Sequence, residues 1–450
     1  MDTHYCGSQN CVDKREKKGS HLEQKLICDE EQGNYGWFCS DEEAGIDSRH
    51  DKEWRALAGE GTTFFRSCLN GLNTICGIGI LSISYALSEA GWAGLALLFL
   101  VAIVCCYTGI LLQRCMDTDT NIQTYPDIAD RAFGYYGQVI LSVFFYLELY
   151  LVAIEFLILE GDNLAKLFPS LSFEVAGWTI ERTQGFIILS ALIILPTAFL
   201  RSLDLLAYVS ASGILASLVV IASVTSSGLV DGVGFHSKGR ALNPSGIPSA
   251  ISLFAFCYCG HAVFPTICSS MKDRTKFSKV LILSFTISTL IYGSMGILGY
   301  LMYGEEVKSQ VTLNLPNGKL SSKIAIYTTL INPFTKYALV VTPIASAIED
   351  ALPSTKSSRS TNIFMRTLLM ASTVTVALTI PLFGDLMTLI GSFLSCTVSL
   401  IFPCICYLKL FGISRIYKLE LMFICGILGV GSSIAILGSY YSLRQIAENL

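Results

Sequence analysis

Long apolar stretches separated by short polar connections dominate the chain after residue 60. A helix needs roughly 20 predominantly apolar residues to cross the hydrocarbon core of a bilayer. Stretches of this kind recur, and we predict eleven spans at approximately residues 63–87, 91–113, 136–158, 184–200, 204–227, 248–269, 278–302, 323–348, 362–383, 386–408 and 420–443. The pattern therefore predicts an all-α multi-pass membrane protein. A short amphipathic helix over 125–134 is predicted to lie on the membrane surface.

Composition supports this interpretation. The 450 residues are 52% hydrophobic and 15% charged, with a mean hydropathy of +0.55, whereas a soluble domain is about 25% charged. The formal net charge of −4 is uneven, because residues 1–60 hold 8 Lys and Arg against 14 Asp and Glu. The first 60 residues therefore carry −6 and the remainder +2, which excludes a nucleic-acid-binding body. We predict that 1–60 is a disordered acidic cytoplasmic tail, either a solvated terminus or a sorting or regulatory segment.

Basic residues in the connections indicate the orientation. Cytoplasmic loops carry an excess of Lys and Arg, and the densest cluster is Lys272, Arg274, Lys276 and Lys279. Placing this cluster in the cytoplasm also places the N-terminus there. An odd number of spans then predicts a C-terminus on the opposite side.

Two predicted spans are interrupted by helix-weakening residues. The first contains Gly77 and Gly79, and the sixth contains Gly260 and Pro265. Glycine destabilises a helix interior by about 1 kcal/mol relative to alanine. Spans one and six begin two sets of five, and matching interruptions in two halves are typical of an inverted-repeat transporter. The alternative is that these glycines only allow close helix packing.

An unwound segment inside the membrane has a specific chemical use. It frees backbone N–H groups that can hold an α-carboxylate and carbonyl groups that can hold an ammonium. Such a site recognises what every amino acid shares, without an arginine in the bilayer.

Ionisable residues within spans are costly and usually functional. Glu148 and Glu155 lie seven residues apart and hence on one helix face. Lys336 follows Pro333 and either occupies the place of a coupling cation or pairs with a glutamate. His261 is either a proton carrier or a hydrogen-bonded packing residue. We therefore name Glu148, Glu155, His261 and Lys336 as proton-coupling candidates.

The 16 cysteines do not change this picture. Most lie in apolar spans, where Cys behaves as a small hydrophobic residue, and none shows the paired spacing of a zinc site. No ATP-binding or hydrolase motif occurs. We therefore predict no metal, no cofactor and no enzymatic activity.

Together these residues resemble the amino acid/auxin permease (AAAP) family and, within it, the plant vacuolar amino acid transporters. The matching stretches are Thr62–Asn70, Gly77–Leu87, Gly91-Trp92, Tyr125–Ala129, Phe156–Leu164, Gly260–Pro265, Asn332–Tyr337 and Pro381–Asp385. They cover nearly the whole membrane domain but not the tail. Ser84 departs from the pattern, because many relatives have proline there.

The resemblance implies a LeuT-like 5+5 inverted repeat plus one extra span, 11 transmembrane helices in all. The domain is then 61–450, with repeats at about 62–227 and 248–408 and the extra helix at 420–443. An N-terminus in the cytosol and a C-terminus in the vacuolar lumen are also implied. The two breaks would line the substrate pocket, and the predicted substrate-binding residues are Asn73, Thr74, Gly77, Ile78, Gly79, Phe256, Tyr258, Cys259 and Gly260.

The leading hypothesis is a proton-coupled secondary transporter that moves neutral amino acids across the vacuolar membrane by alternating access. Its partners would be amino acids, protons and the lipid bilayer, and its transport unit a monomer. One alternative is an amino acid receptor or channel that uses the same cleft and signals through the tail. Another is an auxin or amino acid importer of the plasma membrane.

Overall fold

The computed structural model describes residues 61–175, 178–198, 206–350, 359–380 and 382–449. The predicted tail, residues 1–60, lies outside the described residues. Within them the chain is almost entirely helical, and its only strands form a small antiparallel hairpin, β1 (Phe173–Val175) with β2 (Trp178–Ile180).

The helices follow the apolar stretches closely. Up to the hairpin they are α2 (Phe64–Ile75), the 3-10 turn η1 (Ile78–Leu81), α3 (Ile83–Ala90), α4 (Gly94–Met116), α5 (Tyr125–Phe133) and α6 (Tyr135–Leu167). Next come α7 (Arg182–Ala198), α8 (Leu206–Leu229), α9 (Ile247–Cys257), α10 (Phe264–Ser270) and α11 (Phe277–Tyr303). The last are α12 (Leu320–Asp350), α13 (Arg359–Thr379), α14 (Phe383–Leu389), the π-helical η8 (Ile390–Ser395) and η9 (Thr397–Ile401), α15 (Phe402–Phe411) and α16 (Lys418–Asn449).

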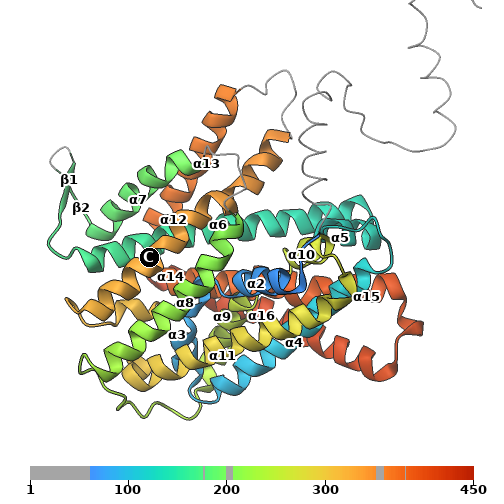
Figure 1. Cartoon of the computed structure of the whole chain (residues 1–450), viewed down its shortest axis with the longest axis horizontal. Coiled ribbons are helices and arrows are strands. Elements are labelled where there is room, and N and C mark those ends of the chain that lie inside the picture. The colour runs from blue at the N-terminus through green and yellow to red at the C-terminus, as the bar shows by residue number, and fades with distance from the viewer. Residues whose placement is uncertain (1–60, 176–177, 199–205, 351–358, 381, 450) are drawn as a thin grey trace, which may run out of the picture. The chain divides into compact units, whose positions relative to one another are not determined.

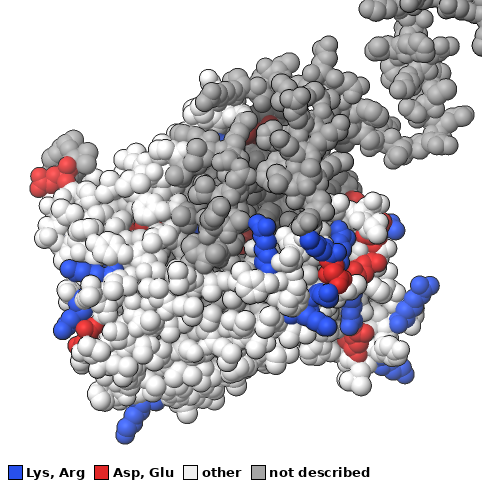
Figure 2. All heavy atoms as spheres, viewed as in Figure 1, with Lys and Arg blue, Asp and Glu red and all other residues white. Residues whose placement is uncertain are grey.

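Several of these helices are long enough to cross a bilayer. Seven helices in the described part of the chain have sufficient length and apolar character, and three shorter apolar helices accompany them. Figure 2 shows charged side chains gathered at the two ends of the visible face, with a broad uncharged zone between them. Many large apolar side chains of the described helices are exposed, among them Ile103 of α4 and Leu290 of α11. The chain is therefore a multi-pass membrane protein, because only a bilayer solvates such a surface.

Different elements and polar contacts lie at the two ends of the helix bundle. Figure 1 shows α5 toward one end and the β1–β2 hairpin at the other, with α6 running between them. At the α5 end, Arg114 of α4 forms an ion pair with Glu420 of α16 (2.6 Å). At the hairpin end, Lys166 donates to the carbonyl oxygen of Thr312 (2.9 Å). The short helix predicted over 125–134 is α5, which begins with a capping box between Thr124 and Asp127.

The tenth predicted stretch, 386–408, is not a regular α-helix. It passes from α14 through the π-helical η8 and η9 into α15. π-Helical turns are rare and occur frequently at functional sites. Gly391 of η8 packs directly on α9, because a side chain there would contact the backbone of Ser252.

Candidate functional site

Both glycine-rich interruptions are true breaks in the structure. The first break, residues 76–82, separates α2 from α3 and includes η1, and the second break, residues 258–263, separates α9 from α10. Pro265 lies in the first turn of α10, where its missing N–H removes no helical hydrogen bond. The first and the sixth predicted spans are therefore each two half-helices joined by irregular backbone, as the sequence predicted.

The two breaks lie against each other. A Cβ on Gly79 would come within 2.6 Å of Cys257 Sγ, at the end of α9, and within 3.2 Å of its Cα. A Cβ on Gly260 would come within 3.1 Å of Thr74 in α2. The absent side chains at Gly79 and Gly260 therefore allow the backbones of the two broken spans to approach closely.

A cavity of about 220 Å³ lies where the breaks meet α6 and α12. Its walls are mostly apolar, and its lining residues are Thr74, Ile75, Gly77, Ile78, Gly79, Phe145, Glu148, Leu149, Val152, Phe156, Phe256, Cys257, Cys259, Gly260, Ala262, Val263 and Lys336. A mostly apolar pocket with a few polar groups is typical of a small-molecule site.

Glu148 is held at the wall of this cavity by two other elements. Its Oε1 accepts hydrogen bonds from Ser395 Oγ of η8 (2.7 Å) and from Cys259 Sγ of the second break (3.3 Å). Ser399 of η9 in turn donates to Cys259 Sγ (3.1 Å). One carboxyl group therefore connects α6, the second break and the π-helical stretch.

Lys336 faces the same cavity from α12, three residues after Pro333. A Cβ on Gly213 of α8 would come within 3.8 Å of its Nζ and would also meet the side chain of Asn73. Among the ion pairs of the described residues, none joins Lys336 to Glu148 or Glu155.

The other two ionisable candidates do not line the cavity. Glu155 is fully buried, and neither of its carboxyl oxygens has a hydrogen-bond partner among the described groups. His261 is also buried, and its Nε2 donates to the carbonyl oxygen of Cys105 (3.0 Å) and lies 2.9 Å from the hydroxyl of Thr108. Both of His261's partners belong to α4.

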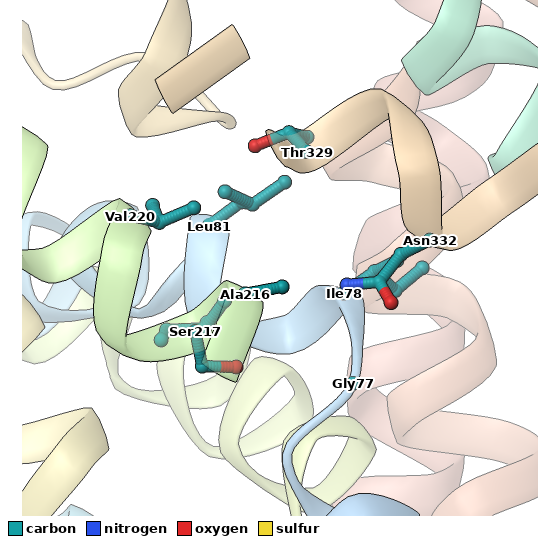
Figure 3. Close-up of a pocket in the computed structure, with 9 residues that line it drawn as sticks. Gly77, Ile78, Leu81, Ala216, Ser217, Val220, Thr329 and Asn332 are labelled. Carbon is teal, nitrogen blue, oxygen red and sulfur yellow. The ribbon is translucent and has the colours of Figure 1, made fainter. Parts of the chain in front are cut away.

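A second, much smaller cavity lies on the other side of the first break. It measures about 10 Å³, which is room for about one water molecule. Figure 3 shows it between Ser217 of α8, Thr329 and Asn332 of α12 and the turn that carries Ile78. The Thr329 hydroxyl is buried and has no hydrogen-bond partner among the described groups.

The structure thus brings most of the predicted substrate-binding residues together. Those lining the large cavity are Thr74, Gly77, Ile78, Gly79, Phe256, Cys259 and Gly260, together with the coupling candidates Glu148 and Lys336. Asn73 and Tyr258 are not in its wall; Tyr258 is fully buried and donates its hydroxyl hydrogen to Thr289 of α11 (2.9 Å).

Sequence reasoning missed two groups of residues. The first is the α6 wall, Phe145, Leu149, Val152 and Phe156, which shares the helical face of Glu148 and was readable from its spacing. The second is Ser395 and Ser399. Nothing in the sequence distinguishes them from the many other serines of the spans, because their importance comes from which helix they face.

Comparison with known proteins shows which family the chain belongs to. Residues 60–442 match the family described as transmembrane amino acid transporter protein. The chain is similar to Amino acid transporter AVT1I of Arabidopsis thaliana, with 48% identity over 86% of this chain and 95% of that protein. It is 44% identical to Amino acid transporter AVT1B of the same plant, over 86% of this chain and 72% of that protein.

A more distant relative is the Vesicular GABA transporter of Caenorhabditis elegans, 26% identical over 86% of this chain and 81% of that protein. The family match covers both broken spans and every wall of the cavity. The chain therefore belongs to the transmembrane amino acid transporter family, the amino acid/auxin permease family that its motifs resemble.

Proposed function

We propose that this protein is a proton-coupled secondary transporter that moves neutral amino acids across the vacuolar membrane by alternating access. The observation that carries the proposal is the cavity at the contact between the two helix breaks. At about 220 Å³, it is far larger than the roughly 10–15 Å³ that one water molecule needs by the same measure.

The cavity wall divides the recognition of an amino acid into two parts. Gly77, Gly79 and Gly260 present backbone at the breaks, where carbonyl ends of half-helices attract an ammonium and free N–H groups attract a carboxylate. Phe145 and Phe256 belong to the apolar remainder, which suits an uncharged substrate side chain. This division supports neutral amino acids as the substrate class.

Proton coupling rests on the ionisable groups in the wall. Glu148 is the carboxyl that both lines the cavity and contacts the second break, so its protonation state would affect substrate site and helix break together. Lys336 lines the same cavity and would supply a positive group, in the role otherwise taken by a coupling cation. Glu155 and His261 are secondary candidates because neither lines the cavity.

The membrane arrangement completes the proposal. We propose eleven spans in a LeuT-like 5+5 inverted repeat, with repeats at 62–227 and 248–408 and an extra helix at 420–443. The broken pairs α2–α3 and α9–α10 then count as spans one and six. The basic cluster 272–279 supports an N-terminus in the cytosol. Similarity to the AVT1 transporters supports the vacuolar membrane.

Reconstitution into liposomes tests the transport activity. Purified protein should accumulate a neutral amino acid when a pH gradient is imposed, and a protonophore should abolish the uptake. Replacing sodium with choline should leave the uptake unchanged. Binding of amino acids without gradient-dependent flux, across a broad substrate panel, would favour a receptor instead.

The location requires a separate experiment. A fluorescently tagged chain in plant cells should label the vacuolar membrane, and labelling of the plasma membrane would favour the importer alternative. Protease accessibility of tags at each end, in isolated vacuoles, tests the orientation: the N-terminal tag should be cleaved and the C-terminal tag protected.

A further inference from the structure

α11 presents polar side chains to both helix breaks. Ser288, Thr289 and Tyr292 are buried on this predominantly apolar helix. Cys76 of the first break donates to Ser288 Oγ (3.2 Å), and Tyr258 of the second break donates to Thr289 Oγ1 (2.9 Å). One helix face therefore contacts both irregular segments.

Tyr292 makes the most unusual of these contacts. Its hydroxyl lies 2.6 Å from the carbonyl oxygen of Ile75, the last residue of α2, and 3.2 Å from that of Cys257, the last residue of α9. Its ring packs edge-on against Tyr258, with centroids 5.4 Å apart. One hydroxyl group is therefore within hydrogen-bond distance of the last carbonyl group of both half-helices.

The physical chemistry of helix ends explains why this contact matters. The last carbonyl groups of a helix lack an intrahelical partner, and they carry its negative partial charge. Ile75 O also accepts the N–H of Gly77 (2.8 Å), so its position is tied to the first break. Without the hydroxyl, the carbonyl oxygen of Cys257 would lose this donor, and that of Ile75 would keep the N–H of Gly77 but lose its link to α11.

We propose that Tyr292 is a positioning residue that fixes the carbonyl ends of α2 and α9 relative to each other, and so shapes the subsite for the substrate's ammonium group. This inference rests on the proposed transport function. Tyr292 itself does not line the cavity, but Ile75 and Cys257, the two residues whose carbonyl groups it holds, both do. Tyr292 therefore acts on the substrate only through these two carbonyl groups.

Tyr292→Phe tests the inference because it removes the hydroxyl and keeps the ring. The matched control is Tyr300→Phe on the same helix, since Tyr300 is equally buried but accepts a hydrogen bond from the Arg240 N–H (2.8 Å), outside the cavity. In proteoliposome uptake, Tyr292→Phe should raise KM about tenfold or more, as expected when buried acceptors lose their donor. Vmax should change much less, and Tyr300→Phe should leave KM unchanged.

A second pair of variants covers the case in which Tyr292→Phe fails to fold. Thr289→Val removes the partner of Tyr258, whereas Thr286→Val removes a hydroxyl that bonds only within its own helix, to Ile282 O (2.7 Å). Thr289→Val should raise KM several-fold and Thr286→Val should not.

The outcomes separate the two proposals. An inactive wild-type protein would count against the transport function itself. An active wild type with an unchanged KM in Tyr292→Phe, or with the same increase in Tyr300→Phe, would overturn the positioning role. If Tyr292→Phe cannot be recovered, an unchanged KM in Thr289→Val overturns it.

Discussion

The two helix breaks contact the same cavity but are anchored in different ways. The first break presents glycine backbone, and one of its anchors is the bond from Tyr292 to the carbonyl oxygen of Ile75. The second break turns side chains into the protein, Tyr258 toward α11 and His261 toward α4. The comparison shows that two similar glycine-containing interruptions are held in place by different contacts with the neighbouring helices. Gly79 in the first break leaves no room for a side chain against Cys257, whereas in the second break Tyr258 and His261 also need hydrogen-bond partners on neighbouring helices.

The largest effect is expected at the carboxyl that binds the second break. Glu148→Gln keeps the size of the side chain and an oxygen that accepts from Ser395 and Cys259, but the amide cannot exchange a proton. Uptake driven by a pH gradient should be largely abolished, while substrate binding survives. Glu155→Gln is the comparison variant: its carboxyl does not line the cavity, so as a secondary candidate it should impair coupling less than Glu148→Gln does. The assignment fails if Glu148→Gln still couples uptake to the gradient.

Gly79→Ala should have the next largest effect, through steric overlap. Its Cβ would overlap Cys257 Sγ at 2.6 Å, and overpacking of this kind costs about 1–3 kcal/mol. Initial uptake rates should fall about tenfold, on the scale of that strain. Adding Cys257→Ala to Gly79→Ala should restore part of the rate because it removes the sulfur. Normal uptake by Gly79→Ala would show that the two breaks do not touch during transport.

His261→Phe should reduce stability rather than coupling. The ring shape is kept, but the bond from Nε2 to Cys105 O is lost, which destabilises the fold by about 1 kcal/mol. Thermal unfolding in detergent should shift down by a few degrees, with the pH profile of uptake unchanged. Thr108→Val should act in the same direction. An altered pH profile would instead identify His261 as a proton carrier.

The smallest effect is expected for Gly77→Ala. A Cβ on Gly77 would meet no atom within 4 Å, and its φ of −95° is accessible to any residue. The stability of the folded protein should therefore stay within about 0.5 kcal/mol of wild type, because a substitution without steric conflict changes little, and thermal unfolding in detergent measures this. Strong loss of uptake would mean that this position closes around the substrate in another conformation.

Much of the architecture could be predicted from local features of the chain. The predicted apolar stretches coincide with helical segments, seven of which in the described residues are long and apolar enough to cross a membrane, and both interruptions occur where Gly77, Gly79, Gly260 and Pro265 predict them. Most of the predicted substrate-binding residues line one cavity, although their role in binding stays a prediction. The π-helical stretch within 386–408 was not predicted, because its apolar residues fit a regular α-helix equally well.

The ionisable residues mark the limit of such prediction. Glu148 and Glu155 share a helix face by spacing, yet only Glu148 lines the cavity. His261 adjoins Gly260, yet its side chain is bound to α4. In each case the neighbouring helix, and not the residue type, determines what the side chain contacts.

The sequence by itself determined that this protein is a multi-pass membrane protein of an amino acid transporter family with two broken spans, because hydrophobic length, helix-weakening residues and family motifs are local properties of the chain. Only the tertiary structure decided that Gly79 and not Gly77 meets the other broken span, and that Ser395 holds Glu148. It also decided that the Tyr292 hydroxyl contacts the last carbonyl groups of both α2 and α9. The physical reason is that these contacts join residues far apart in the chain, and their geometry is fixed only when the helices pack.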